Sequence, residues 1–519
     1  MIPPLKQLSV TRMIDFTPIA RMLFVRKARQ ARSWQGREEE VQRKVLLSLL
    51  RRAASTEVGR RHGFADVAAS ASPESAYAGA LSAQEYESFR ADVMRMVAGE
   101  RDVLWPGRCD RYAQSSGTTG GRSKYVPVTD DGLRENHYGG AAFTMGLYLD
   151  SCPHSRVFSG KALILGGSYA SQLKPTRAGV AVGDLSATLI DRINPLVNLF
   201  RVPDKRTALL SDWEQKLPLL AGKAAAADVT SLSGVPSWML RVLLKVMELR
   251  GTDSLARIWP RLEVFFHGGI SFQPYRSEYE QICSGLDMHF FETYNASEGY
   301  FATADHPGDT GMRLILEAGV YYEFMPLGGS RAVGVSGVES GKVYELIVSS
   351  SNGLWRYRTG DTVKIESVSP LRVTIAGRTR SFINAFGEEL MEDNAETAIA
   401  EACRRTGAAI VNYTAAPVYA EGRRRGCHQW IIEWQSCPDS RQRFAEILDD
   451  ELRKVNSDYD AKRSRTIFLD PPQIVDARSG LFDSWLGGVG SHRLGGQRKV
   501  PRLSNDRRIV DRLLELNNF

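Results

Sequence analysis

The segment from Tyr112 to Thr129, YAQSSGTTGGRSKYVPVT, constrains this chain more than any other stretch. Its centre, Ser115 to Gly121, holds four hydroxyl side chains and three glycines in seven positions, and Arg122 and Lys124 follow. Glycines let a bent backbone turn its N–H groups toward an anion, and the hydroxyls and cations add donors and positive charge. The segment is therefore a candidate phosphate-binding loop, with a flexible Ser/Gly turn as the alternative. It is not a Walker loop, because that motif needs glycine at the position of Arg122.

The size and charge of the chain limit the classes of protein it can belong to. A length of 519 residues exceeds what one hydrophobic core usually fills, so we expect two or more domains. The net charge of +7 is mild for this length, and the basic residues are dispersed. This distribution fits small polyanionic molecules at least as well as nucleic acid, and no nucleic-acid recognition module is present, so we expect no nucleic-acid partner.

The cysteines and the apolar runs indicate where the protein works. The six cysteines are never closer than ten residues apart, so no CxxC pair suggests zinc or redox chemistry. The amino terminus lacks the apolar core of a signal peptide, and no run of about 18 apolar residues predicts a membrane span. We expect a cytoplasmic protein without membrane association, acting as a monomer or weak dimer.

Helical patterns dominate the first 150 residues. Apolar residues recur at helical spacing from Glu38 to Arg52, which predicts an amphipathic helix. Ser82 to Glu85 has the sequence of a capping box and predicts the start of a second helix there. After the Ser/Gly segment, Thr129 predicts the start of a third helix that runs to about Leu149.

Short apolar runs then alternate with a helical pattern, which predicts a mostly parallel sheet covered on both faces. The predicted strands are Lys161 to Gly166, Val229 to Gly234, Leu262 to Gly268 and Met288 to Tyr294. A helix from Pro236 to Leu249 lies between the second and third, with Trp238 on its buried stripe. Ligands of such sheets bind at the carboxyl ends of the strands, where Gly268-Gly269 and Tyr294 to Glu298 lie.

Beyond Met312 the pattern is antiparallel and strand-rich, and after about Asn384 it becomes that of a small α+β unit whose first helix is predicted from Phe386 to Arg405. We therefore predict an α/β protein with two domains. Residues 1–379 form a large, multilayer N-terminal domain of mostly parallel sheets with a β-rich subdomain. Residues 380–519 form a small, mobile α+β domain that carries a basic, glycine-rich loop.

Three further segments carry groups suited to a magnesium nucleotide. Tyr294 to Glu298 offers an aromatic face, the hydroxyl of Ser297 and a carboxylate, and Mg²⁺ takes one or two protein carboxylates beside phosphate oxygens. Asp361 ends the predicted tight turn YRTGD and can accept two ribose hydroxyls, and Gly268-Gly269 lets the backbone lie against a planar ring. The alternatives are an exposed glutamate at a strand end, a plain hairpin turn and a strand-end breaker.

In their order along the chain, these motifs resemble those of the adenylate-forming superfamily of firefly luciferase and acyl-CoA synthetases. SSGTT with YNASE, the segment TEVGRRHGF at Thr56 to Phe64 and the strand VYYEFMP at Val320 to Pro326 narrow the resemblance. In these features the chain is similar to the acyl-acid amido synthetase family, typified by plant enzymes that conjugate auxin or jasmonate to amino acids. The resemblance covers nearly the whole chain, from about Val41 to Leu503.

The resemblance implies that a carboxylic acid attacks MgATP to give an acyl-adenylate and pyrophosphate, and that an amine or amino acid then displaces AMP. It also implies a role for each motif. The implied phosphate-binding residues are Ser115, Ser116, Gly117, Thr118 and Thr119. Glu298 would hold the metal and take part in catalysis. Gly268, Gly269 and Tyr294 would contact adenine, Ser297 would lie beside them, and Asp361 would hold the ribose with Arg378 close by.

The resemblance also implies a hinge at Gly377 to Ser381 and a mobile catalytic lysine, for which we choose Lys499. The usual hinge carboxylate is replaced here by Arg380 or Ser381, and the glycine-rich loop departs from the common form, so that Arg498 or Arg502 is an alternative cation. Two further alternatives for the function stay open. One is a ligase with coenzyme A or another thiol as acceptor, and the other is a non-catalytic nucleotide-binding relative.

Overall fold

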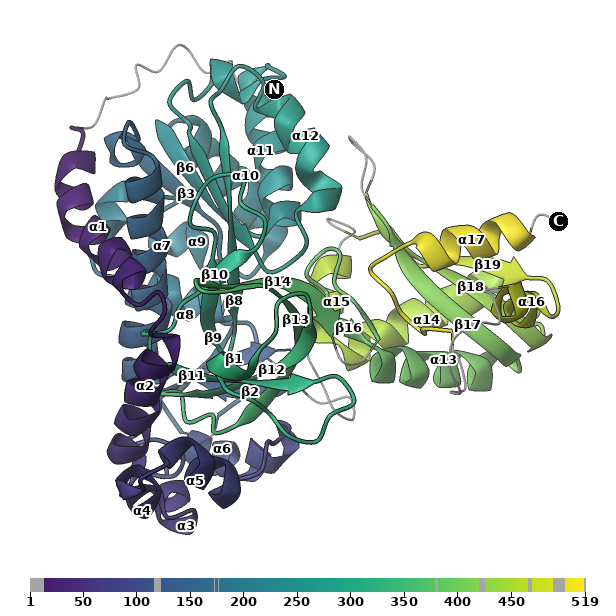
Figure 1. The fold of residues 1–519 in the computed structure, drawn as a ribbon. Helices are drawn as coiled ribbons and strands as arrows, with labels where there is room; N and C mark the ends of the chain where they lie inside the picture. Colours follow the sequence, from purple (N-terminus) through teal and green to yellow (C-terminus); the bar gives the residue numbers. More distant parts are fainter. Residues whose placement is uncertain are drawn as a thin grey trace. The chain divides into compact units, whose positions relative to one another are not determined.

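The structure is a computed structural model that describes residues 14–115, 123–171, 173–175, 177–378, 381–419, 425–464, 469–488 and 500–517 (Figure 1). The chain divides into two compact units. The first comprises Met1–Gln114 and Tyr125–Thr379, and the second comprises Ser115–Lys124 and Arg380–Phe519.

The first unit is built on an eleven-stranded mixed sheet. In spatial order its strands are β11 (Val320–Pro326), β12 (Val343–Ser350), β13 (Tyr357–Val368), β14 (Leu371–Arg378), β10 (Met312–Leu314), β9 (Gly299–Thr303), β8 (His289–Ala296), β7 (Val264–Gly268), β6 (Val229–Gly234), β3 (Lys161–Ile164) and β5 (Arg201–Val202). A three-stranded sheet in the order β2 (Lys124–Pro127), β1 (Arg111–Ser115) and β4 (Ala181–Gly183) accompanies it.

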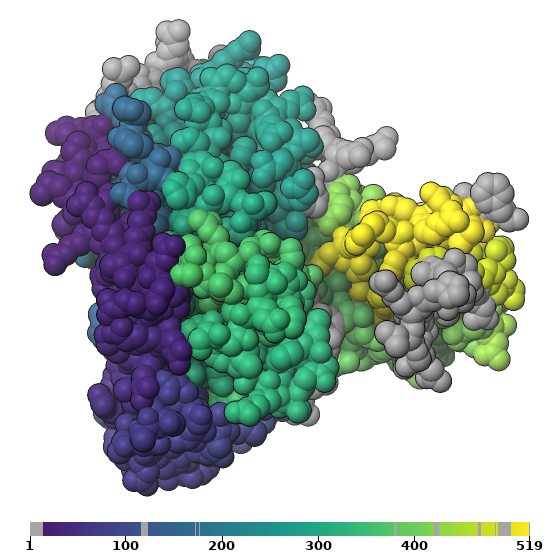
Figure 2. All heavy atoms as spheres, viewed as in Figure 1, coloured from purple at the N-terminus to yellow at the C-terminus, as the bar shows by residue number. Residues whose placement is uncertain are grey.

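The helices form a capping layer at the amino terminus and two layers about the sheet. The amino-terminal helices are α1 (Thr17–Ser33), α2 (Glu38–Ala53), α3 (Glu57–Arg61), α4 (Phe64–Ala69), α5 (Pro73–Ala80) and α6 (Glu87–Ala98). The others are the π-helical segment η1 (Gly132–His137), α7 (Tyr138–Ser151), α8 (Leu185–Arg192), α9 (Lys205–Ala208), α10 (Trp213–Ala225), α11 (Pro236–Arg250) and α12 (Arg276–Ile282), with short turns η2 (Val157–Ser159), η3 (Val197–Phe200), η4 (Leu255–Arg257), η5 (Gln273–Tyr275) and η6 (Val335–Gly337). In Figure 2 the atoms of the amino-terminal helices, purple to blue, form one continuous surface along a side of this unit.

The predicted α/β class is confirmed. Strands β5, β3, β6, β7 and β8 pair in parallel, and their helical crossovers place α10 and α11 between successive strands of the sequence. The predicted β-rich part is not a separate layer, because β9 reverses directly after β8 and pairs antiparallel with it. The later strands therefore extend the same sheet.

Burial on both faces explains why these strands read as nearly continuous apolar runs. Side chains alternate across a strand, and in β7 Phe266 faces α7, where its ring lies 5.4 Å from that of Tyr148. Phe265 faces the opposite way and stacks at 5.1 Å on Tyr279 of α12. Each residue of β7 thus contributes to one of two cores.

Two predicted helix starts have different outcomes. Thr129 caps its helix, since its hydroxyl accepts a hydrogen bond from Gly132 N at 2.9 Å. The predicted capping box at Ser82 to Glu85 is wrong: α6 begins only at Glu87 and has no side-chain cap. The backbone of Gln84 instead pairs with the residues flanking Tyr357, donating to Arg356 O at 2.9 Å and accepting from Arg358 N at 2.8 Å. Long-range backbone pairing here outweighs a local cap.

The second unit is an α+β fold. Its elements are β15 (Phe382–Ile383), β16 (Leu390–Met391), α13 (Glu392–Thr406), β17 (Ala409–Val418), β18 (Cys427–Ser436), α14 (Arg441–Val455), α15 (Ser457–Arg463), β19 (Gln473–Ala477), α16 (Leu481–Gly488) and α17 (Arg508–Asn517). The helix predicted from Phe386 begins six residues later, because residues 390–391 pair with residues 382–383 as a short hairpin first. Among the helices that the structure describes, none has the length and apolar character needed to cross a membrane.

His137, in the π-helical segment η1, gives the fold a pH dependence. Its side chain is buried, and burial lowers its pKa to about 4, so the folded protein holds a neutral imidazole. The unfolded chain binds a proton below an ordinary pKa of 6.5. Stability should therefore fall as the pH decreases from about 6.5, with this residue contributing about 3 kcal/mol of the loss at pH 4.

Urea unfolding at neutral and acidic pH measures this effect. His137→Gln should lose less stability than the wild type between the two conditions, whereas His154→Gln, at an exposed position, should match the wild type. Equal losses in the wild type and His137→Gln would contradict the expected role of His137.

Candidate active site

Asp361 lies at an irregularity inside a long strand. The predicted tight turn at Tyr357 to Asp361 is wrong, because β13 runs unbroken from Tyr357 to Val368 and its register with β12 shifts in this stretch. Gly360 adopts φ +79°, and Asp361 N donates to Thr359 Oγ1 at 3.1 Å. Between the pairs Ile347–Arg358 and Glu345–Thr362, β13 has two residues more than β12. Extra residues of this kind bend a strand and redirect side chains, which is a common arrangement at binding sites.

A hydrogen bond joins two predicted site residues from distant strands. The hydroxyl of Tyr294 on β8 donates to Asp361 Oδ2 at 2.6 Å. In the sheet, β8 and β13 are separated by β9, β10 and β14. Side chains four strands apart can touch only if the sheet curls strongly, so curvature brings the ends of β8 and β13 together.

Glu298 lies in the turn that follows β8, and it also contacts β13. Its side chain accepts a hydrogen bond from the Tyr357 hydroxyl at 3.2 Å, and its backbone carbonyl accepts from Asn352 Nδ2 at 3.4 Å. Only 9% of Glu298 is exposed, so the alternative of an exposed strand-end glutamate does not apply. Each carboxylate of the predicted nucleotide site therefore accepts a hydrogen bond from a tyrosine of another segment: Asp361 of β13 from Tyr294 of β8, and Glu298 after β8 from Tyr357 of β13.

The glycine pair after β7 is required by close packing. A Cβ on Gly268 would lie 2.3 Å from Thr293 O on the neighbouring strand β8, and Gly269 adopts φ +85°. Thr293 Oγ1 also donates to His267 O at 3.0 Å, which holds the two strand ends together. Because Gly268 has no side chain, the end of β7 can lie this close to β8.

His267, directly before this pair, is a core residue with a neutral ring. Its imidazole stacks on Phe272 at 4.2 Å, and burial, assisted by the positive charge of Arg276, lowers its pKa to about 3. The imidazole therefore adds no positive charge beside the glycines.

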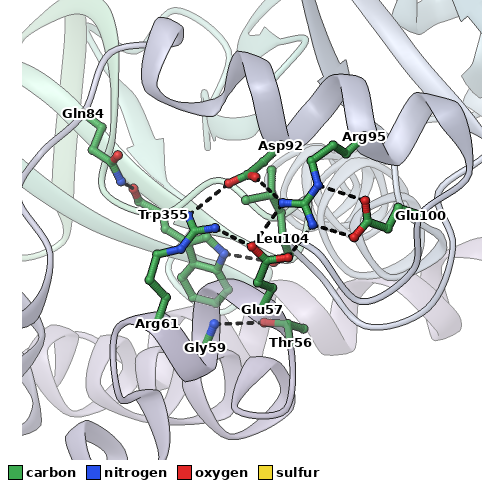
Figure 3. Close-up of polar contacts among 10 residues, drawn as sticks. All are labelled: Thr56, Glu57, Gly59, Arg61, Gln84, Asp92, Arg95, Glu100, Leu104 and Trp355. Carbon is green, nitrogen blue, oxygen red and sulfur yellow. Dashed lines mark hydrogen bonds and ion pairs between the residues drawn. The ribbon is translucent and has the colours of Figure 1, made fainter.

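The segment that follows α6 contacts a residue just before β13, and ion pairs join α3 and α6 nearby (Figure 3). The Trp355 indole, just before β13, donates to Leu104 O at 3.0 Å. Glu57 of the Thr56 to Phe64 segment bridges Arg61 of α3 and Arg95 of α6, and the hydrogen bond from Arg95 lowers the pKa of Glu57 to about 2. Because these charges are solvent-exposed, they fix the orientation of α3 and α6 more than they add stability.

A buried ion pair holds the residue between Trp355 and Tyr357. Arg356 donates to both carboxylate oxygens of Glu323 on β11, each at 2.9 Å, and also to Leu81 O at 2.6 Å. Bidentate pairing of this kind fixes geometry as well as charge. The start of β13, and with it the Tyr357 hydroxyl, is therefore held from two sides.

The predicted site residues fall into three groups. Tyr294, Glu298 and Asp361 are brought together, while Ser297 follows β8 and Gly268 and Gly269 end the adjacent strand β7. Ser115 ends β1, and the backbone of Arg378 ends β14 paired with Asp361. The remaining predicted residues, Ser116, Gly117, Thr118, Thr119 and Lys499, lie outside the described residues.

Sequence reasoning missed Tyr357 as the partner of Glu298. The sequence contains a signal for this residue, because Tyr357 begins the YRTGD segment that contains Asp361. A cluster with metal-ligand spacing also escaped it. Asp305, His306 and Asp309 lie within 4.8 Å of one another, but Arg372 pairs with both carboxylates, so their charge is already compensated.

Solved structures with the same fold include an acyl acid amido synthetase and a CoA ligase. The structure is similar to the acyl acid amido synthetase AtGH3.15 in complex with 2,4-DB, with a TM-score of 0.61 and 19% identity over 95% of both chains. It is also similar to 2-hydroxyisobutyryl-CoA ligase in complex with 2-HIB-AMP and CoA, with a TM-score of 0.55 and 11% identity over 92% of both chains. At these identities the likeness is one of fold.

The chain belongs to the GH3 family. Residues 29–220 match the GH3 family N-terminal domain, residues 313–378 the central domain and residues 393–508 the C-terminal domain. A similar curated relative is the probable indole-3-acetic acid-amido synthetase GH3.1 of Oryza sativa subsp. japonica. It is 23% identical over 557 residues, which cover 91% of this chain and 88% of the relative. The family predicted from the motifs is confirmed.

Gly268→Ala tests the close approach of β7 and β8. The added methyl group would meet a backbone oxygen that cannot move alone, so we expect a loss of about 1–3 kcal/mol in unfolding free energy. Gly79→Ala is the matched control, since a Cβ there meets nothing within 4 Å and alanine favours the helix. Urea denaturation compares the two, and equal stability of both variants would exclude the steric constraint at Gly268.

Proposed function

We propose that this protein uses ATP to activate a carboxylic acid as an acyl-adenylate and then transfers the acyl group to an amine or amino acid. In the first step a carboxylate oxygen attacks the α-phosphorus, and the bond to pyrophosphate breaks. In the second step the amine nitrogen attacks the acyl carbonyl, loses a proton and expels AMP. The named relatives, indole-3-acetic acid-amido and acyl acid amido synthetases, support this reaction class.

The observation that carries the proposal is that two hydrogen bonds, Tyr294 to Asp361 and Tyr357 to Glu298, join residues 294–298 to residues 357–361. A carboxylate that already receives one hydroxyl, as Asp361 does from Tyr294, is suited to accept the ribose hydroxyls as well. The ring of Tyr294 and the side-chain-free surface of Gly268 and Gly269 are suited to a planar base. Ser115 to Thr119 would bind the phosphates, and Ser297 and Arg378 would complete the nucleotide site.

Mg²⁺ fits the same residues. The carboxylate of Glu298 is largely buried and accepts a hydrogen bond from the Tyr357 hydroxyl, and Mg²⁺ takes few protein carboxylates when phosphates supply other ligands. A bound Mg²⁺ would neutralise charge on the phosphates. Glu298 would orient it, and the Tyr357 hydroxyl would orient Glu298.

The carboxyl-terminal part of the second unit, from residue 380 on, would supply the mobile cation. Arg502, one of the alternatives, contacts Asn412, Tyr413 and Glu396 within that unit, with its guanidinium 4.6 Å from the Tyr413 ring. These contacts favour Lys499 or Arg498 for the role. We further propose that the protein works in the cytoplasm, where its six free cysteines would stay reduced.

Acid-dependent exchange of labelled pyrophosphate into ATP tests the function. We expect exchange with at least one member of a broad acid panel, followed by amide formation when amino acids or amines are added. Supplying coenzyme A separately distinguishes a thiol acceptor. No exchange with any acid would refute the proposed adenylation, and product with the thiol alone would replace the amide ligase by a thioester ligase.

Two aspartate variants test whether pyrophosphate exchange depends on the candidate active site. Asp361→Asn should lower kcat/KM for ATP by about 10–100-fold, because charge-assisted hydrogen bonds contribute about 1.5–3 kcal/mol. Asp253→Asn, at a side chain that is 90% exposed, should leave the exchange unchanged.

Lys499→Ala tests the mobile cation. A contact made mainly in the transition state should cost about 10²–10³ in the adenylation rate while ATP affinity, measured by calorimetry, stays nearly constant. Lys454→Ala, on the exposed face of α14, is the control. Unchanged turnover of Lys499→Ala would transfer the role to Arg498.

A further inference from the structure

Lys216, in the first turn of α10, is a buried cation held by backbone carbonyls. Only 2% of the residue is exposed, and its amine donates to Gly166 O at 2.5 Å and Gly167 O at 3.4 Å. The ring of Trp213, one turn earlier, lies 5.6 Å from the amine. Among the described residues Lys216 forms no ion pair with a carboxylate. Lysine is rarely buried without such a partner.

The position of Lys216 is at the ligand-binding edge of the parallel sheet. Helix α10 leads into the amino end of β6, so its own first turn lies at the carboxyl edge, where α11 begins after β6. The ring of Trp213 accordingly meets that of Trp238, in the first turn of α11, at 5.5 Å. The predicted buried stripe of α11 is wrong for Trp238, which is only partly buried because it lies at this edge. Gly268 and Gly269 end β7 at the same edge.

Keeping this amine buried has an energetic cost. Burial lowers the pKa of Lys216 to about 8, and the negative charge of Asp184, the N-cap of α8, opposes part of that shift. The folded protein therefore binds this proton less tightly than the unfolded chain. A buried charge that reduces stability and has only carbonyl partners suggests a role other than stability.

The carbonyls that Lys216 holds begin a segment that reaches the start of the Ser/Gly loop. Gly167 N donates to Ser186 Oγ at 2.7 Å, which fixes the turn against α8. A few residues on, Ser171 donates to the side-chain oxygen of Gln114. Gln114 directly precedes Ser115, the first residue of the predicted phosphate-binding loop. A chain of contacts thus runs from the Lys216 amine to the last residues of β1.

We propose that Lys216 is a positioning residue for adenylation: its amine fixes Gly166 and Gly167, and through residues 167–171 it fixes Gln114 near the end of β1. The proposal rests on the proposed function. Lys216 would act on the reaction without contacting the nucleotide, through the placement of Gln114.

Three variants test this role in pyrophosphate exchange. Lys216→Met keeps the size of the side chain but removes its donors and charge, and it should lower kcat by about 10–100-fold with a smaller change in KM, as small displacements of reacting groups do. Lys216→Arg should restore part of the rate. Lys223→Met, at an exposed position of the same helix, should match the wild type.

The pH profile separates positioning from stability. Wild-type exchange should decline above about pH 8 as the amine loses its proton, while Lys216→Arg stays charged and should not share that decline. The contribution of Lys216 to stability has the opposite trend, because the unfolded chain still holds the proton up to its ordinary pKa of 10.5 and stability rises with pH over that window. The decline in exchange would therefore not reflect unfolding.

Hydrogen exchange read by mass spectrometry provides a measurement that needs no activity. Lys216→Met should speed amide exchange in residues 166–171 and 111–115 without lowering the melting temperature at neutral pH, and Lys223→Met should do neither. If the wild type is inactive with every acid, the proposed function fails while this measurement still tests Lys216. Unchanged amide exchange in Lys216→Met, or activity lost only in proportion to unfolding, would overturn the positioning role.

Discussion

The hydrogen bond between Tyr294 and Asp361 depends on a sheet that curls until side chains of β8 and β13 meet. Without that curvature Tyr294 and Asp361 would lie four strands apart. The curvature is secured where β13 begins, since Arg356 is paired with Glu323, Trp355 is bonded to Leu104 and Phe89 of α6 packs against the Tyr357 ring at 5.9 Å. The amino-terminal helices therefore act on the site by holding one strand in place.

The parts of the fold that could be predicted from sequence are those where burial alone decides conformation. The strands from Val229 and Val264 are buried on both faces, so their apolar runs were recognisable, and Pro236 marks the start of α11 correctly. Where distant backbone decides, sequence reasoning failed. Gln84 pairs with residues more than 270 positions away beside the start of β13, and residues 390–391 pair back with residues 382–383 before α13 begins. Local capping signals contain no information about either pairing.

In the candidate site, too, the sequence predicts some residues, whereas others depend on distant contacts. The residue types of Tyr294, Glu298 and Asp361 were apparent because each stands in a segment rich in turn-forming residues. The contact between Tyr357 and Glu298 depends on the curl of the sheet, so the residues next to Tyr357 in the sequence do not predict it. Lys216 gave no signal at all, since a lysine inside an amphipathic helix usually lies on the solvated face, and only the three-dimensional path of α10 turns it inward.

The continuity of the large sheet has a consequence for how the chain could be rearranged. Strands β11 and β12 pair along their whole length, and the turn between them carries the exposed Leu327 beside Gly328. Opening the backbone there would leave each new end anchored in a paired strand. A circularly permuted protein with its new termini in this connection, residues 327–342, should therefore assemble the same curled sheet, and a tag could be attached there.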